Sequence, residues 1–370
     1  MKKHSYTGHN ISFFMSKNTV LVVFGGSSLE HKVSLDSAQT IIQWLDRDKY
    51  DILTLGISKT GECFLWPQAM DMLLSESQDY SGTEDIFLIG HRANTCGHFI
   101  QCLNSLIKQP DIIFPIIHGF TGEDGRLQGV LDLLWIPYVG SGVSGSAICM
   151  DKIFTKAILG KNGISQLPYY WFTDFDWQEK REAVLREIRS LGFPLFIKPA
   201  NLGSSIGISK VVSIDTLITS IEEALKYDKR ILAEQWLDRP REIELAVIGH
   251  DQFMISCAGE VLLDKKYEFY TYEAKYIDTA WTRTDIPADI SPELYMILRD
   301  FAEESCHALN IRGLCRVDFF VDQATGKYYL NELNTMPELT LDSMFASLWR
   351  ASGLEYPLLL DHLIEFAQKK

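Results

Sequence analysis

The sequence has 370 residues, a formal net charge of −14, and 46% hydrophobic and 23% charged residues. These values are typical of a soluble globular chain of two or three domains. The negative charge disfavours nucleic acid or an anionic membrane as the main partner, and no apolar run is long enough to span a membrane. Seven cysteines without a CxxC pair indicate reduced thiols in a cytoplasmic protein, not disulfides or a zinc site.

Residues 1–18 are polar and mixed, and they lack the apolar core and cleavage site of a signal peptide. We expect them to form an N-terminal extension. Either Met1 or Met15 could be the true start, because the first convincing strand begins at Val20.

Residues 19–143 alternate between strand and helix patterns, which predicts an α/β domain with a doubly wound parallel sheet. Ser34 is predicted to be the N-cap of the first helix, because apolar residues follow it at helical spacing. Ligands of such sheets bind at the carboxyl ends of the strands. The predicted strands are 19–26, 50–58 and 111–119, and the helices are 34–45 and 126–135.

Two further α+β domains are predicted, over residues 144–240 and 241–370. One long helix is expected over 146–163, with Gly163 as its C-cap. The other predicted helices are 178–192, 214–227 and 291–309, and the strands are 194–200, 231–237 and 241–249.

The most informative residues lie in a predicted hairpin, whose strands are 313–322 and 327–334. Arg316 and Asp318 are two residues apart, and so are Glu332 and Asn334, so each pair shares one face of its strand. Two carboxylates and an amide oxygen could hold a magnesium ion together with phosphate. An internal salt bridge of Arg316 would explain the same residues, and the hairpin alone does not separate the two interpretations.

Two motifs in the middle of the chain could bind a nucleotide. Lys198 ends an apolar strand and precedes a glycine-serine turn at 203–207, where backbone N–H groups and hydroxyls could meet a phosphate. Glu234 and Glu242 lie on and after a later strand and could bind adenine and ribose. An ordinary turn and solvated glutamates are the alternatives.

Three loops could contact a small ligand. His118 ends a buried strand before a glycine-rich acidic loop, and Glu30 precedes the first helix. The aromatic segment 269–276, with Lys275, suits a lid over a polar ligand. A structural histidine, a favourable helix dipole and a surface loop are the corresponding alternatives.

The two nucleotide motifs and the three loops are five motifs. In their order and spacing along the chain, they resemble those of the D-alanine–D-alanine ligases of the ATP-grasp superfamily, and the resemblance runs from about Val20 to the C-terminus. The resemblance implies an N-terminal α/β domain and two ATP-grasp α+β domains that hold ATP between them. It implies an ATP-dependent ligase that joins two D-alanines through an acyl phosphate, giving D-alanyl-D-alanine for peptidoglycan. It also implies ATP and two magnesium ions, with manganese as an alternative, and a homodimer.

The resemblance assigns the substrate-binding residues. Glu30 would hold the ammonium of the first D-alanine and His118 its carboxylate. Ser204 and Tyr276 would form a hydrogen-bonded triad with Glu30. Arg316 would stabilise the tetrahedral oxyanion. The second D-alanine would contact the loop that contains Glu338, Ser343 and Met344.

The resemblance also assigns the ATP and metal ligands. Lys152 and Lys198 would bind phosphates with help from Ser205, and Lys275 would approach the γ-phosphate. The base and ribose would contact Glu234, Leu237 and Glu242. The magnesium ligands would be Asp318, Glu332 and Asn334.

The loop NTMPELTLDS (334–343) departs from the family pattern NTMPGFTS. Glu338 stands in place of a glycine and would be strained if that position needs a positive φ. Leu341 replaces a serine, and Asp342 adds a carboxylate near the acceptor site. The acceptor pocket could therefore prefer a second substrate with a positive side chain, or the loop could have repacked neutrally.

Three functions remain to be compared at this point. The leading one is a D-alanine–D-alanine ligase, and Tyr276 favours an amide-forming enzyme over a D-lactate ligase. The alternatives are an ATP-grasp carboxylate–amine ligase with a different acceptor and a nucleotide-binding pseudoenzyme. The three metal ligands, retained with Arg316 and two lysines, disfavour the pseudoenzyme.

Overall fold

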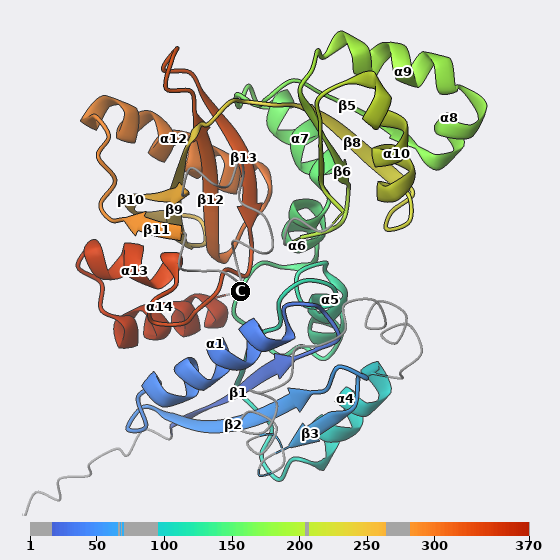
Figure 1. Ribbon diagram of the computed structural model, residues 1–370. Helices are drawn as coiled ribbons and strands as arrows, with labels where there is room; N and C mark the ends of the chain where they lie inside the picture. Colours follow the sequence, from blue (N-terminus) through green and yellow to red (C-terminus); the bar gives the residue numbers. More distant parts are fainter. Residues whose placement is uncertain are drawn as a thin grey trace, which may run out of the picture.

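The part of the chain that the structure describes forms three β-sheets, each built from one continuous segment and flanked by helices (Figure 1). The computed structural model describes residues 17–65, 67, 69, 95–203, 207–263 and 282–369. Among these residues, no helix combines the length and apolarity needed to cross a membrane. The strand orders are β3-β2-β1-β4, β5-β8-β6-β7 and β11-β10-β9-β12-β13.

The N-terminal sheet has helices on both faces, which confirms the predicted doubly wound architecture. Its parallel strands are β1 (Asn18–Gly25), β2 (Tyr50–Ile57) and β4 (Ile112–Ile116), and β3 (Cys63–Leu65) is antiparallel. Alternate residues of β1 point to opposite faces. One set packs with α1 (His31–Trp44), and the other packs with α4 (Thr95–Ser105) and α5 (Arg126–Leu133).

Ser34 is not the N-cap of the first helix, so this prediction was wrong. The helix begins at His31, and Ser34 is buried inside it. Its hydroxyl accepts a hydrogen bond from the N–H of Gly25 at 2.7 Å and donates to the carbonyl of Ile116. Ser34 therefore joins the carboxyl ends of β1 and β4, and the loops after these two strands lie side by side.

The central sheet is antiparallel, with β5 (Tyr169–Thr173), β6 (Leu195–Pro199), β7 (Ser209–Val211) and β8 (Arg230–Gln235). One face packs against α8 (Asp174–Glu179), α9 (Arg181–Ser190) and α10 (Ile214–Ala224). The single helix predicted over 178–192 is interrupted at Lys180. Residues 178 and 179 end α8, and α9 begins at Arg181 and ends at Ser190. The opposite face carries Lys198 and Glu234, because alternate residues of a strand point to opposite sides.

The long helix predicted over 146–163 is two helices, α6 (Val143–Met150) and α7 (Lys152–Lys161). Asp151 separates them, because its carboxylate accepts hydrogen bonds from the N–H groups of Ile153 and Phe154 at 3.0 and 3.1 Å. This cap begins a new helix within an apolar pattern that continues across the break. Gly163 follows α7 with φ +79°, as expected for a residue that ends a helix.

The C-terminal sheet contains the predicted hairpin, now confirmed by the pairing of β12 (Gly313–Val321) with β13 (Tyr328–Asn334). The other strands are β9 (Arg241–Gly249), β10 (Phe253–Leu263) and β11 (Thr282–Asp285). One face packs against α12 (Pro292–Ala308), and part of the other packs against α13 (Met344–Ala351) and α14 (Tyr356–Gln368).

The N-terminal and C-terminal sheets share one hydrophobic core, in which α14 lies against α1 (Figure 1). The junction also has polar contacts, since Asp361 accepts hydrogen bonds from Lys49 Nζ at 2.6 Å and from the Tyr50 hydroxyl at 3.0 Å. These contacts hold the N-terminal sheet and α14 together.

Candidate active site

A cleft of about 560 Å³ lies where the three sheets meet. Its walls come from the loops after β1 and β4, the inner face of the central sheet, one face of the β12–β13 hairpin, and the loop before α13. This volume is within the range of small-ligand sites.

Of the predicted site residues that the structure describes, all but Leu237 line this cleft. Leu237 is half-buried on the connection after β8. Ser204, Ser205, Lys275 and Tyr276 lie outside the described residues. The lining residues predicted from the sequence are Glu30, His118, Lys152, Lys198, Glu234, Glu242, Arg316, Asp318, Glu332, Asn334, Glu338, Ser343 and Met344.

The hairpin presents its four polar residues to the cleft in two opposed pairs. Arg316 is opposite Asn334, and Asp318 is opposite Glu332. Arg316 also forms a salt bridge with Asp318, which was the alternative interpretation of the hairpin. Its Nε and Nη2 atoms each lie 2.8 Å from an oxygen of Asp318. The salt bridge thus exists on the same face that carries the candidate metal ligands.

Glu244 is a further carboxylate of this site that we did not predict. It lies on β9 directly opposite Asp318, and its Oε2 is 2.9 Å from Arg316 Nε. Burial lowers the pKa of Arg316, but Asp318 and Glu244 outweigh this effect and raise it well above its usual value. Glu244 follows Glu242 by two residues, so the strand spacing used for the hairpin could have identified it.

The hairpin residues fit a magnesium ion that binds together with a nucleotide. Asp318 and Glu332 supply carboxylates, and the Asn334 amide oxygen is oriented by the N–H of Met336, which donates to it at 3.1 Å. Within the described ranges, no three His, Cys, Asp or Glu side chains converge into a metal site. Magnesium often takes only one or two carboxylates and completes its shell with phosphate and water.

The central sheet and α7 together contribute a cationic wall opposite the hairpin. Lys198 Nζ lies 2.5 Å from Glu234 Oε2, and Lys156 contacts the other oxygen of Glu234. Lys152 donates to the carbonyl of Leu202, in the chain that leads to the glycine-serine turn. Lys156 was missed, although it is four residues after Lys152 and therefore on the same face of α7.

Glu234 remains ionised despite its burial. Desolvation raises its pKa, but Lys156 and Lys198 outweigh desolvation and lower the pKa to about 2. Around Glu234 the wall therefore holds the two charges of Lys156 and Lys198 and one carboxylate charge, which leaves a net positive charge that suits a phosphate.

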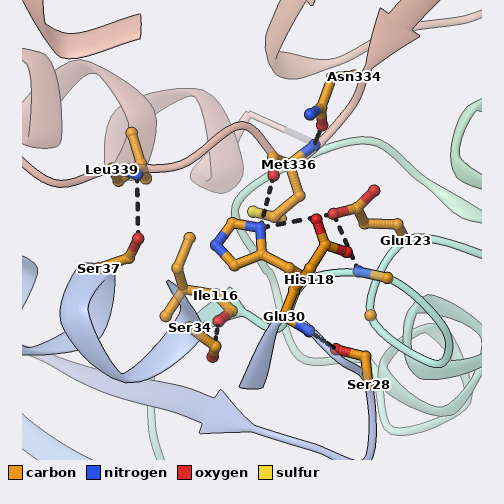
Figure 2. A network of polar contacts seen from close by, with 12 residues as sticks. Ser28, Glu30, Ser34, Ser37, Ile116, His118, Glu123, Asn334, Met336 and Leu339 are labelled. Carbon is orange, nitrogen blue, oxygen red and sulfur yellow. Dashed lines mark hydrogen bonds and ion pairs between the residues drawn. The ribbon is translucent and has the colours of Figure 1, made fainter. Parts of the chain in front are cut away.

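His118 joins the loop after β4 to the segment that follows the hairpin (Figure 2). Its Nδ1 lies 2.9 Å from the carbonyl oxygen of Met336, so Nδ1 carries the proton and donates, and it lies 3.5 Å from Glu123 Oε1. Nε2 is buried and has no hydrogen-bond partner within the part of the chain that the structure describes. Burial lowers the His118 pKa, but Glu123, Glu30 and Glu338 together raise it above its usual value.

Glu30 lies next to two glycines that approach it closely. A Cβ atom at Gly119 would be 3.1 Å from Glu30 Oε2, and one at Gly203 would be 4.0 Å away. Gly119 has φ +75°, so both its backbone and its neighbour disfavour a side chain. Glu30 therefore lies where the loop after β4 meets the turn after β6.

The loop before α13 is fixed at both ends. The N–H of Leu339 donates to Ser37 of α1 at 3.1 Å (Figure 2), and Ser343 caps α13 by accepting from the N–H of Ala346 at 3.4 Å. Glu338 accepts a hydrogen bond from the Thr340 hydroxyl at 2.6 Å. Glu338 does not have a positive φ, so the strain considered for glutamate at this position does not arise.

The three-sheet fold, with a carboxylate–amide hairpin facing a lysine-bearing sheet across one cleft, is that of the ATP-grasp ligases. Two family models match the chain, "D-ala D-ala ligase N-terminus" over residues 19–141 and "D-ala D-ala ligase C-terminus" over residues 158–365. The chain therefore belongs to the D-alanine–D-alanine ligase family.

Individual relatives agree with this membership. The chain is 40% identical to the D-alanine–D-alanine ligase of Acetivibrio thermocellus over 367 residues, with 96% of each chain covered. It is 42% identical to that of Thermoanaerobacter sp. (strain X514) over 353 residues, with 95% of this chain and 97% of the relative covered.

Two solved structures are also similar to this chain. The VanG D-Ala:D-Ser ligase from Enterococcus faecalis has a TM-score of 0.76 and 30% identity, with 95% of this chain and all of that chain covered. The D-alanine–D-alanine ligase from Coxiella burnetii has a TM-score of 0.76 and 31% identity, with 95% of this chain and 94% of that chain covered.

Proposed function

We propose that the protein is an ATP-dependent ligase that joins two D-alanines and supplies D-alanyl-D-alanine for peptidoglycan. The observation that carries this proposal is the shared cleft. The hairpin face with Asp318 and Glu332, the cationic wall with Lys198, and the His118 loop all line it. A binding module without chemistry would not need all three groups around one space.

The reaction has two steps. An oxygen of the first D-alanine carboxylate attacks the γ-phosphorus of ATP and ADP leaves, which gives an acyl phosphate. The amine of the second D-alanine then attacks the carbonyl carbon, inorganic phosphate leaves, and the amine loses a proton. Lys152 and Lys198 meet the phosphate charge, with Ser205 and Lys275 as further phosphate contacts, because phosphoryl transfer depends mainly on positioning and electrostatics.

The first D-alanine is bound by the N-terminal loops. Glu30 takes its ammonium group, and His118 takes its carboxylate through Nε2, the ring nitrogen that has no partner among the described residues. By the family resemblance, Ser204 and Tyr276, which lie outside the described residues, would form a hydrogen-bonded triad with Glu30.

The second D-alanine and the oxyanion face the C-terminal sheet. Ser343 and Met344 line the acceptor side of the cleft, and Arg316 donates to the developing oxyanion. Asp318, Glu332 and Asn334 would hold two magnesium ions, or manganese, with the nucleotide. The ions would neutralise phosphate charge during the transfer. The base and ribose contact Glu234 and Glu242, which line the cleft, and Leu237 on the connection after β8 is a further proposed contact.

We further propose a homodimer of chains with three domains, 19–143, 144–240 and 241–370, after the extension 1–18. Each sheet falls within one of these segments. Leu133 and Trp135, at the end of α5, are 82% and 92% exposed, and exposed apolar clusters commonly mark protein interfaces. The seven free cysteines suit the reducing cytoplasm.

The proposal is tested by ADP release from ATP with and without D-alanine, together with detection of the dipeptide by mass spectrometry. Release that depends on D-alanine, with dipeptide formed, is the expected result. ATP binding without turnover on any substrate would support a nucleotide-binding pseudoenzyme instead.

A second candidate is a related ligase with another acceptor, and Glu338 favours it. This carboxylate lines the cleft with Asp342 and Ser343, where it would repel the carboxylate of an acceptor and attract a positive side chain. The same assay with D-serine, D-lysine and D-ornithine as second substrates decides between the candidates, and the one with the highest kcat/KM is the acceptor.

A further inference from the structure

Three charged side chains are buried together in the cationic wall, and one of them, Lys156, has no role in the reaction described so far. Lys156, Lys198 and Glu234 are 5%, 9% and 1% exposed. They come from α7, β6 and β8, and each lysine contacts a different oxygen of Glu234. All three line the cleft.

Lys156 has further contacts besides the one with Glu234. Its ammonium lies 5.3 Å from the centre of the Tyr169 ring, which is opposite Glu234 in the sheet. Its backbone carbonyl accepts a hydrogen bond from Gln166 at 3.0 Å, and Asp151 caps the helix that carries it. These contacts place Lys156 beside Glu234 on the helix side of the wall. Lys198 lies near the end of β6, with its ammonium 5.1 Å from the centre of the Phe196 ring.

The number of charges matters for nucleotide binding. A pair of Lys198 and Glu234 alone would be neutral, and Lys198 could meet a phosphate only by leaving a buried carboxylate without a partner, which is strongly unfavourable. With Lys156 on the other oxygen, Glu234 keeps a cation when Lys198 turns to the phosphate. The wall then also keeps a net positive charge.

We propose that Lys156 is a positioning residue that fixes the Glu234 carboxylate as the hydrogen-bond acceptor for the 6-amino group of the base, and so selects ATP. The inference rests on the proposed use of ATP in this cleft. A purine with a carbonyl group at position 6 would point an oxygen at the fixed carboxylate. Such a purine would be repelled where adenine is bound.

ATP and ITP are the appropriate probes, because they differ at position 6 of the base. Their binding to the full chain is measured by calorimetry with magnesium and without D-alanine, for the wild type, K156M, K156R and K161M. Lys161 is exposed on the same helix, so K161M is the matched control. The ratio of the two dissociation constants is the readout, since general damage to the fold would weaken both nucleotides equally.

In K156M, the preference for ATP over ITP should fall by about tenfold, a change well above calorimetric error. K156R should retain most of the preference, K161M should match the wild type, and the KM for D-alanine should not change in K156M. A K156M preference within twofold of the wild type, or equal weakening of both nucleotides, would overturn the inference.

A further variant covers the case in which K156M does not fold. K156Q keeps a hydrogen-bond donor for Glu234 but not the charge, so its preference for ATP should be lower than that of K156R, and equal preferences would overturn the inference. The binding experiment also separates this inference from the proposed reaction. Absence of D-alanine-dependent ADP release would refute the reaction, whereas the nucleotide preference would still report on Lys156.

Discussion

Arg316 separates two buried carboxylates, so its removal should destabilise the fold. Asp318 and Glu244 are directly opposite each other on β12 and β9, and Arg316 pairs with both at 2.8 and 2.9 Å. The three side chains are 17% exposed or less. R316M keeps the length and apolar stem of the side chain but removes its charge, which leaves like charges facing each other.

The magnitude of this effect has an upper limit. Breaking a buried ion pair by removing one partner costs about 3–5 kcal/mol. One carboxylate could instead become protonated, which at pH 7 costs about 4 kcal/mol for an ordinary aspartate and at pH 5.5 only about 2 kcal/mol. Because the site is open to the cleft on one side, we expect a loss of about 3 kcal/mol near pH 7 that decreases as the pH falls.

Equilibrium urea unfolding near pH 7 and near pH 5.5, without nucleotide or magnesium, measures this loss. R283M is the matched control, because Arg283 is 74% exposed and pairs with Asp285 on the surface at 2.9 Å. The control should lose less than about 1 kcal/mol. A loss below about 0.5 kcal/mol in R316M, or an equal loss at both pH values, would refute the reasoning about buried charge.

Three further changes test other parts of the site. The folded protein raises the pKa of His118 above its usual value of 6.5. The contacts of protonated His118 therefore stabilise the fold below pH 6.5, and this stabilisation is lost as the pH rises through the raised pKa. In urea unfolding, H118N should be more destabilising near pH 6 than near pH 9. E332Q should raise the magnesium concentration for half-maximal ADP release by at least about tenfold, and an unchanged requirement would contradict the metal assignment. E338G should raise kcat/KM for D-alanine as acceptor by about tenfold with an unchanged KM for ATP, because it removes a carboxylate that repels the acceptor; no change would indicate neutral repacking of the loop.

The sequence predicted the hairpin face well, because alternation along a strand is a local property of the backbone. Arg316, Asp318, Glu332 and Asn334 share one face and line the cleft. The same rule would have identified Glu244 from Glu242, and helical spacing would have identified Lys156 from Lys152. These two residues were missed although the signal for them was present.

Other features depend on contacts that are remote in the sequence. Ser34 has the local pattern of an N-cap, but the helix already begins at His31. The Ser34 hydroxyl instead donates to the carbonyl of Ile116, 82 residues away. His118 contacts the backbone of Met336, 218 residues later. Such partners follow from the packing of the N-terminal and C-terminal sheets on one core, which no local pattern reveals.

The break at Asp151 has a different cause. The apolar spacing of α6 continues into α7, so periodicity alone predicts one helix. The Asp151 carboxylate instead caps two N–H groups and starts a new helix. The new helix carries both Lys152 and Lys156 to the cleft.

Transfer of oxygen from substrate to phosphate tests the central claim most directly. D-alanine labelled with ¹⁸O in its carboxylate is incubated with the protein, ATP and magnesium, and the released phosphate is examined by mass spectrometry. If the carboxylate attacks ATP to form an acyl phosphate, one labelled oxygen should appear in each phosphate released with dipeptide. Phosphate without the label would mean that the carboxylate never attacked ATP, and it would contradict the reaction proposed for this cleft.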